Sequence, residues 1–414
     1  MNALTQWVGR KFGLTEKGVW AAYFGGSSWS GRNVTHESAM RLSAWFACTR
    51  LIAETISTLP LAVYEKTADG MRRPAPEHPV NVLLQRPNAD QTPVEFWEGQ
   101  VAPICIVGNS YAEKQYIGQR LVALEPIPYI NCQPYRTIDG LLRYRFIDRF
   151  GRRRVDLAEE RVFHIKGFGV GGDLGLSPVG YARNSLGAAM DIEEASSRLY
   201  GTGMRASGIF TAPVDMDKAQ REQFRKNFID KMEGPEAEGT SIVLPPNFKW
   251  QALSIPPKDA EMILSRKFSV EDIARWMGVP PVLIGHSADG QTMWGSGIEQ
   301  IMLGWLTLGL RAYIKRIESA INRRLFSTAD QGRYYAEFNV DGLVRADSQG
   351  RAALMSVLAQ NGLRTRNELR AYDNMPPANG GDVLTVQSNL LPIDQLGKTP
   401  PARVQPAPGE PIPE

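Results

Sequence analysis

The segment from Arg275 to Arg324 constrains the fold most, because it joins a proline stop, a glycine-bounded loop and a long helix. A helix that begins near Asp259 must end at Pro280-Pro281, since two adjacent prolines cannot continue a helix. The loop Gly285–Gly295 follows, and a new helix begins directly after it. This order predicts two helices that present a polar loop between them.

The second helix is predicted from Ser296 to Arg324, since Ser296 and Glu299 form a capping-box pattern. It would be about 40 Å long, well beyond the average globular helix. Its second half confines apolar residues to one stripe, whereas its first half is apolar around nearly the whole circumference. Such a surface cannot face water, so we expect neighbouring subunits to cover it, with an interface made by Met302, Trp305 and Leu306.

The loop before this helix has one carboxylate and lacks lysine and arginine. A plain surface loop is one interpretation. Its place between two helices favours another, in which a ring of subunits presents the loop towards an axis. The candidate residues are His286, Ser287, Asp289, Gln291, Thr292, Met293 and Trp294.

The remaining pattern is typical of an α+β fold. A helix is predicted from Thr35, broken by Leu59-Pro60-Leu61 before a strand. From Val101 to Val162, β-prone runs alternate with turn residues. Further elements are a helix from Ser177 to Tyr200, a strand near Ile209, a charged helix from Met216 to Met232, strands at Ile242–Leu244 and Tyr334–Phe338, and helices at Asp347–Asn361 and after Thr365.

Composition excludes several classes of protein. The 414-residue chain has a formal net charge of +3, which implies no global field for binding nucleic acid or membranes. Three distant cysteines are expected to be buried free thiols, and four scattered histidines predict no metal site. We find no signal peptide and no apolar run of about 18 residues, so the protein is expected to be cytosolic when made and not bound to a membrane.

Two segments resemble nucleotide-binding motifs of enzymes, but the sequence around each of them does not fit such a site. Gly167–Gly172 fits a dinucleotide-binding glycine pattern, but the following helix begins only at Ser177, so a flexible junction is the better interpretation. Gly397-Lys398-Thr399 lacks the first glycine of a phosphate-binding loop, because Pro392 occupies that position. We therefore predict no catalytic residues and no cofactor.

Two basic segments have both an ordinary and a functional interpretation. Between Arg143 and Arg154, arginines alternate with aromatic residues, which fits a hairpin better than a nucleic-acid platform. In the charged helix, Lys218, Arg221, Arg225 and Lys226 fit a solvated face, and a surface for docking a partner is the second interpretation.

The chain resembles portal proteins of tailed bacteriophages, of the siphophage type, over nearly its whole length. The motifs that carry the resemblance are Leu59-Pro60-Leu61, His78-Pro79, Arg86-Pro87-Asn88, Gly108-Asn109-Ser110-Tyr111-Ala112, His164-Ile165-Lys166, Gly175-Leu176-Ser177-Pro178, the run from Ile273 to Gly285, and the run from Gly362 to Arg370. One departure is Met277 where phenylalanine is common, which is an apolar exchange of similar volume.

The resemblance implies a portal fold with wing, stem, clip and crown regions and a long tunnel helix. Mapped onto this chain, the regions are a wing at 1–176 and 325–345, stem helices at 177–200 and 258–278, a clip at 201–257, a tunnel loop at 285–295, a tunnel helix at 296–324, a crown at 346–399 and a disordered tail at 400–414.

The resemblance also implies a role without catalysis in the virion, at one capsid vertex, after assembly in the host cytoplasm. The expected assembly is a dodecameric ring that conducts double-stranded DNA during packaging and ejection. The expected partners are the major capsid protein, the scaffold, the large terminase and a head-completion or adaptor protein.

Overall fold

The computed structural model describes residues 26–67, 70–147, 154–201, 208–211, 217–219, 222, 249–252, 259–286, 296–340, 348–372 and 375–386. The chain divides into two compact units, Met1–Val340 and Asp341–Glu414, and each is described by itself.

Two long helices that pack against each other, α4 and α6, form the centre of the first unit. The predicted helix from Thr35 is divided at Leu42, whose extended backbone ends α3. Trp45, Ile52 and Ile56 of α4 are almost fully buried. The helices of this part are α3 (His36–Arg41), α4 (Ser43–Ser57), α5 (Pro79–Gln85) and α6 (Pro93–Val107).

The prediction of a β-prone region from Val101 is wrong as far as Val107, which lies in α6. The reason is a strong helix start: Glu95 N donates to Thr92 Oγ1 at 3.3 Å, and Thr92 N donates to Glu95 Oε2 at 2.7 Å. Gly108 then ends the helix with a φ of 73°. A capping box therefore decides the conformation of residues whose β propensity points the other way.

The unit also contains antiparallel sheets with the orders β13-β3-β4, β10-β5-β6 and β7-β8-β9, and α6 contacts β5, β6 and β10. In β8, Leu142, Tyr144 and Phe146 are buried while Arg145 is exposed, which confirms the predicted alternation. Their strands are β3 (Leu61–Lys66), β4 (Arg72–Pro74), β5 (Asn109–Ile117), β6 (Arg120–Ile127), β7 (Gln133–Arg136), β8 (Leu142–Ile147), β9 (Arg154–Ala158), β10 (Val162–Lys166) and β13 (Tyr334–Phe338), with single turns η1 (Tyr129–Asn131) and η2 (Glu159–Arg161).

Two further strand pairs are small. They are β1 (Gly26–Ser27) with β2 (Asn33–Val34), and β11 (Gly208–Thr211) with β12 (Lys249–Ala252). The predicted strand near Ile209 is confirmed as β11. The predicted strand at Ile242–Leu244 and most of the predicted helix from Met216 to Met232 lie outside the described residues.

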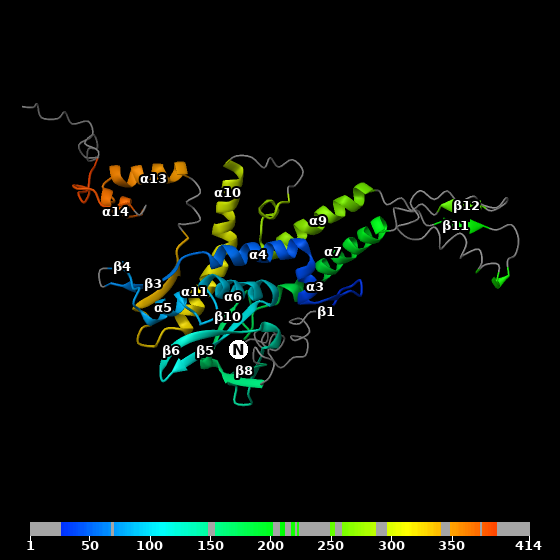
Figure 1. Cartoon of the computed structure of the whole chain (residues 1–414), viewed down its shortest axis with the longest axis horizontal. Coiled ribbons are helices and arrows are strands. Elements are labelled where there is room, and N and C mark those ends of the chain that lie inside the picture. The colour runs from blue at the N-terminus through cyan, green and yellow to red at the C-terminus, as the bar shows by residue number, and fades with distance from the viewer. Residues whose placement is uncertain are drawn as a thin grey trace, which may run out of the picture. The chain divides into compact units, whose positions relative to one another are not determined.

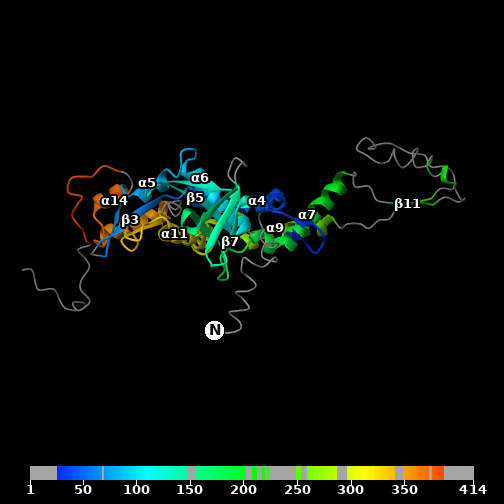
Figure 2. The same cartoon turned by 90° about the horizontal axis from the view of Figure 1, so that it is seen from below.

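Helices α7 (Pro178–Gly201) and α9 (Asp259–Met277) lie side by side next to α4 (Figures 1 and 2). The turn η5 (Pro281–Ile284) follows α9 directly after the predicted proline stop. The predicted long helix is confirmed as α10 (Ser296–Trp305) and α11 (Arg311–Arg324), joined by a π-helical turn, η6 (Leu306–Leu310).

The second unit contains α13 (Ser348–Gln360) and α14 (Arg366–Tyr372). The predicted capping box before α14 is confirmed, because Glu368 N donates to Thr365 Oγ1 and Thr365 N donates to Glu368 Oε2. Asn367 is fixed in turn by the loop after the helix, since its Oδ1 accepts from Ala378 N at 2.8 Å.

Candidate assembly and channel surfaces

The start of α7 is fixed to the end of α6. Ser177 caps α7 as predicted, because its Oγ accepts a hydrogen bond from Gly180 N at 3.2 Å, and the same hydroxyl donates to Ile106 O at 3.3 Å. The prediction of a flexible junction at Gly167–Gly172 needs correction at the first residue, where Gly167 N donates to Gly108 O at 2.8 Å. The segment that leads into α7 is thus hydrogen-bonded to the end of α6.

Asn109 connects this junction to the sheet. Its Oδ1 accepts from Gly175 N at 2.8 Å, while its Nδ2 donates to Gly175 O at 2.9 Å and to Val107 O at 3.1 Å. A Cβ on Gly108 would lie 2.0 Å from Leu176 O, so the backbones approach too closely for any other residue.

A fully buried histidine completes the network. Nε2 of His164 donates to Asn109 Oδ1 at 2.9 Å, and its Nδ1 accepts from the Tyr144 hydroxyl at 3.0 Å. Burial lowers the pKa of His164 well below its ordinary value, and the charges of Lys166 and Arg324 lower that pKa further. The imidazole is therefore neutral at pH 7 and acts as a structural link. No pattern in the sequence indicates this role, although Asn109 and His164 both belong to the motifs quoted above.

The long helix does not expose all of its predicted interface residues. Trp305 is only 7% exposed within its own chain, so its indole has little surface to offer a neighbour. The indole packs close to Gly309, because a Cβ built on Gly309 would lie 2.7 Å from Trp305 Cδ1. The Gly278 carbonyl also approaches Gly309, since its oxygen would lie 3.1 Å from the same Cβ. Met302 and Leu306 are half-buried.

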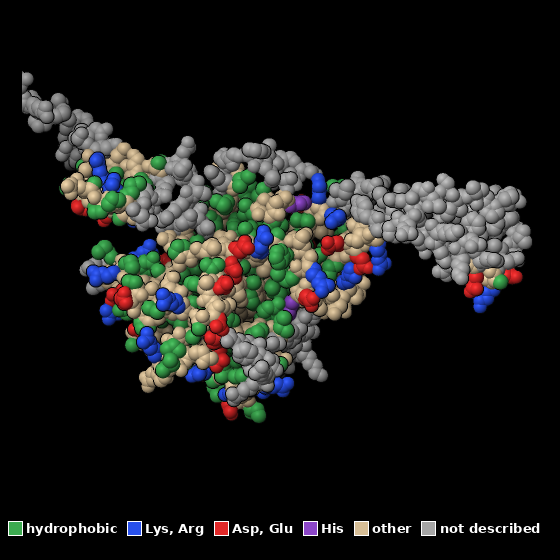
Figure 3. Space-filling model, in the orientation of Figure 1, with side chains coloured by type: hydrophobic (Ala, Val, Ile, Leu, Met, Phe, Trp, Pro, Cys, Tyr) green, Lys and Arg blue, Asp and Glu red, His purple; other side chains and the backbone are tan. Residues whose placement is uncertain are grey.

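Other apolar side chains of this helix reach the surface instead. Leu308 in η6 is 84% exposed, and Leu303 is also exposed. Figure 3 shows hydrophobic side chains at the surface along α10. Leu303 and Leu308 were not among the predicted interface residues, although both belong to the apolar first half of the helix.

Of the predicted tunnel loop, the structure describes the start. Gly285 ends η5 with a φ of 79°, and His286 N donates to Pro281 O at 3.0 Å. His286 Nε2 lies 3.5 Å from Glu271 Oε1 of α9, without the geometry of a hydrogen bond. Ser287, Asp289, Gln291, Thr292, Met293 and Trp294 lie outside the described residues.

Of the predicted docking residues in the charged helix, Lys218 is exposed. The other three, Arg221, Arg225 and Lys226, lie outside the described residues, so the cluster remains a prediction.

The basic strip from Arg143 is partly neutralised by its own sheet. Arg143 Nε lies 2.7 Å from Asp156 Oδ1, and Arg145 lies 3.4 Å from the other oxygen of the same carboxylate. The guanidinium of Arg145 also stacks over the Tyr135 ring at 4.6 Å. These pairs fit the hairpin interpretation, because the arginines already have partners for their charge.

The cysteines are free and buried, as predicted. Burial raises the pKa of Cys48 and of Cys105 to about 12, so both stay protonated. Within the described residues, no group of three or more His, Cys, Asp or Glu side chains is placed to hold a metal ion. Among the same residues, no helix is both long enough and apolar enough to cross a membrane.

Comparison with known proteins identifies the family. The family model described as "Phage portal protein" matches residues 43–374. The portal protein of Enterobacteria phage HK97 is 37% identical over 380 residues, which cover 91% of this chain and 87% of the relative.

Two solved structures share the fold. One is the crystal structure of an HK97 family phage portal protein from Corynebacterium diphtheriae, with a TM-score of 0.57, 16% identity, and coverage of 76% of this chain and 97% of the other. The other is the neck of a native gene transfer agent particle computed with C12 symmetry, with a TM-score of 0.55, 21% identity, and coverage of 87% and 94%. On the family match and the relative from phage HK97, the chain belongs to the phage portal protein family.

Proposed function

We propose that this protein is the subunit of a ring that forms the DNA channel at one vertex of a phage capsid. The ring admits double-stranded DNA during packaging and releases it on ejection. A dodecamer is the expected assembly. The similar necks were computed with C12 and with C6 symmetry, which supports a symmetric ring.

One structural observation carries the proposal beyond family membership. The elements on both sides of the segment 287–295 are described: His286 is bonded to η5 and lies against α9, and α10 begins at Ser296. We infer that these elements present the segment to the channel, since functional residues are often carried on loops between scaffold elements. Its low charge suits a conduit, because a lysine-lined ring would bind phosphates and resist sliding.

We assign the regions of the portal fold to the same residue ranges as in the sequence analysis. Residues 1–176 and 325–345 form the wing, 177–200 and 258–278 the stem, 201–257 the clip and 346–399 the crown. The predicted tail at 400–414 lies outside the described residues. The contact partners of the wing are the major capsid protein and, during assembly, the scaffold. The clip, with Lys218, binds the large terminase first and a head-completion protein afterwards.

Subunit contacts along the long helix involve Met302 and Leu306, whose side chains are half-buried within one chain. Trp305 supports this surface from inside through its contact with Gly309. The protein is a structural component, so the energy for packaging comes from a separate ATPase.

The test is packaging in a reconstituted system of capsid proteins, the motor and this chain. Capsids that contain the chain should protect DNA from nuclease, and capsids assembled without it should stay empty. Equal protection in both preparations would contradict the proposal. Tight, salt-sensitive DNA binding by a monomer would instead favour an adaptor that uses the strip from Arg143 to Arg154.

A further inference from the structure

The indole of Trp29 is 92% exposed at the tip of the turn between β1 and β2. Tryptophan offers a large apolar surface together with one hydrogen-bond donor, and it is enriched among the residues that dominate binding at interfaces. A single exposed apolar residue needs no special explanation. The turn that carries Trp29, however, is fixed in detail.

Hydrogen bonds within the turn set its backbone. Ser28 N donates to Arg32 O at 2.8 Å, and Gly31 N donates to Ser28 O at 3.0 Å. The Ser28 hydroxyl accepts from Arg32 N at 3.2 Å. The backbone N–H of Trp29 itself donates to Asn184 Oδ1 of α7 at 3.2 Å.

Ion pairs and a glycine hold the same turn against α7. Arg32 pairs with Asp191 at 3.3 Å and also with Glu194. A Cβ on Gly187 would lie 2.6 Å from the Ser28 Cβ, so the close packing of the turn against α7 requires glycine at this position. The exposed indole therefore stands on a rigid base, which reduces the entropy that binding would cost.

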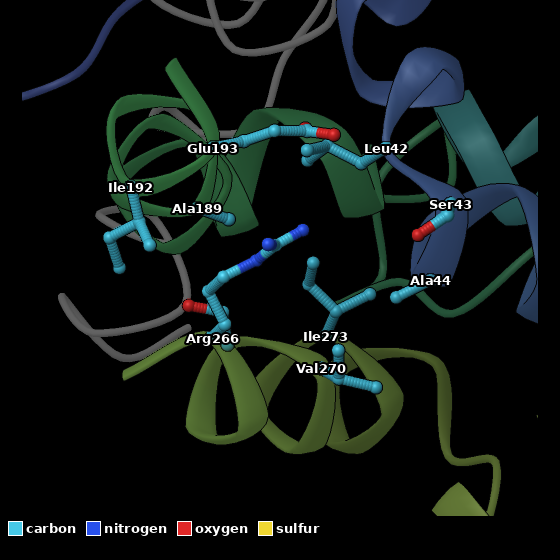
Figure 4. A pocket seen from close by; sticks show the side chains of 10 residues that line it. Leu42, Ser43, Ala44, Ala189, Ile192, Glu193, Arg266, Val270 and Ile273 are labelled. Carbon is cyan, nitrogen blue, oxygen red and sulfur yellow. The ribbon is translucent and has the colours of Figure 1, made fainter. Parts of the chain in front are cut away.

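A pocket on another face of α7 has the chemistry to receive an indole. It lies between α4, α7 and α9 and contains about 400 Å³ of empty space, including the part open to solvent (Figure 4). Its apolar lining includes Ala189, Ile192 and Ile273. The side chain of Arg266 extends into it, and Glu193 lies at its edge. A guanidinium can stack on an indole face, and a carboxylate can accept the indole N–H.

The turn and the pocket lie on opposite sides of α7. At about 100° per residue, Ala189 is about 140° around the helix from Asn184, and Glu193 is about 200° from Asp191. Figure 1 shows the same arrangement, with α9 on one side of α7 and β1 on the other. In a closed ring each subunit meets its two neighbours through different surfaces, so a projection on one side requires a matching recess on the other.

We propose that Trp29 of one subunit inserts into the α4–α7–α9 pocket of the next subunit in the ring. Its ring packs on Ala189, Ile192 and Ile273, beneath the Arg266 guanidinium. This inference rests on the proposed ring and names one contact that closes it.

Site-directed cross-linking tests the contact. Ser30→Cys places a thiol beside Trp29, and Ser269→Cys places one at the pocket; both changes conserve side-chain size. The native cysteines are buried, so a short bismaleimide reacts with the new thiols. The double variant should give a ladder of cross-linked oligomers on a denaturing gel. A mixture of the two single variants should stop at dimers, and each single variant alone should stay monomeric.

Truncation gives an independent measurement. Trp29→Ala should raise the protein concentration needed for half-maximal ring formation at least about tenfold, as expected for an interface hot spot. Trp29→Phe should recover most of this loss. Met71→Ala removes another exposed apolar side chain, far along the chain in the turn before β4, and should change the concentration less than twofold.

These two experiments distinguish a failure of the Trp29 contact from a failure of ring formation. Rings without a cross-linked ladder, or Trp29→Ala rings that form as readily as Met71→Ala rings, overturn the contact and leave the ring intact. A wild-type chain that forms no rings overturns both proposals.

Discussion

The Nζ of Lys114 in β5 donates a hydrogen bond to the Arg324 carbonyl oxygen at 3.0 Å, so a strand residue caps the end of the long helix. A cation at this end interacts favourably with the helix dipole. Lys114 is only 6% exposed, and burial, followed by the charge of Arg324, lowers its pKa to about 8. The helix is thereby fixed to the sheet that also carries Asn109.

This contact predicts a dependence of stability on pH. Between about pH 8 and the ordinary lysine value of 10.5, the unfolded chain keeps a proton that the folded chain has released. Stability therefore rises with pH in this window. Relative to Lys114→Met, the wild type should gain on the order of 1 kcal/mol across the window in urea unfolding. Other titrating groups cancel in the comparison, so a difference independent of pH would contradict this account.

Asn109 is predicted to be a large contributor to stability. Asn109→Ala removes hydrogen bonds to Gly175, Val107 and His164 and leaves their buried groups without partners. The free energy of unfolding should fall by at least about 3 kcal/mol. Gln119→Ala, in the exposed turn before β6, is the control and should stay within about 0.5 kcal/mol of the wild type. Similar values for the two variants would show that the network is not needed.

Two glycines of the long helix give a matched pair. A Cβ at Gly309 would press on Trp305 at 2.7 Å, so Gly309→Ala should destabilise the protein by about 1–3 kcal/mol. At Gly304 a Cβ meets open space among the described residues, so Gly304→Ala should be neutral or stabilising by up to about 1 kcal/mol. Thermal unfolding of both variants measures the contrast. Equal effects would contradict the packing of Trp305 against η6.

Much of the fold follows from local sequence signals. The limits of α9, of the long helix and of β13 were predictable, because prolines, caps and periodicity mark them in the chain. Thr92, Pro93 and Glu95 also mark the start of α6, but the β propensity of the residues after Val101 favours a strand there and hides the end of the helix.

Other features depend on contacts between distant residues. The π-helical turn at Leu306–Leu310 contains Gly309, which lies close to both Trp305 and the Gly278 carbonyl, and helical periodicity cannot reveal the contact with Gly278. The burial of Trp305 within its own chain also depends on such contacts. On a helix that is apolar on all sides, the sequence does not show which residues face their own chain and which face a neighbour. The anchored turn of Trp29 requires α7, which is far away in sequence.

The charge of the loop is predicted to control DNA movement. Replacing both Asp289 and Gln291 with lysine should slow packaging and increase DNA retention, because each new cation adds a phosphate contact and steepens the salt dependence. Replacing both with asparagine is the control and should leave the rate close to that of the wild type. Packaging rates measured over a range of salt concentrations decide the question. Unchanged rate and retention in the lysine variant would show that the loop does not contact DNA.

Electron microscopy of the purified 414-residue chain tests the ring-shaped channel most directly. The protein should form closed rings of uniform subunit number with a central hole. Particles that remain monomeric, or that form open chains without a hole, under conditions where the protein is folded would contradict it.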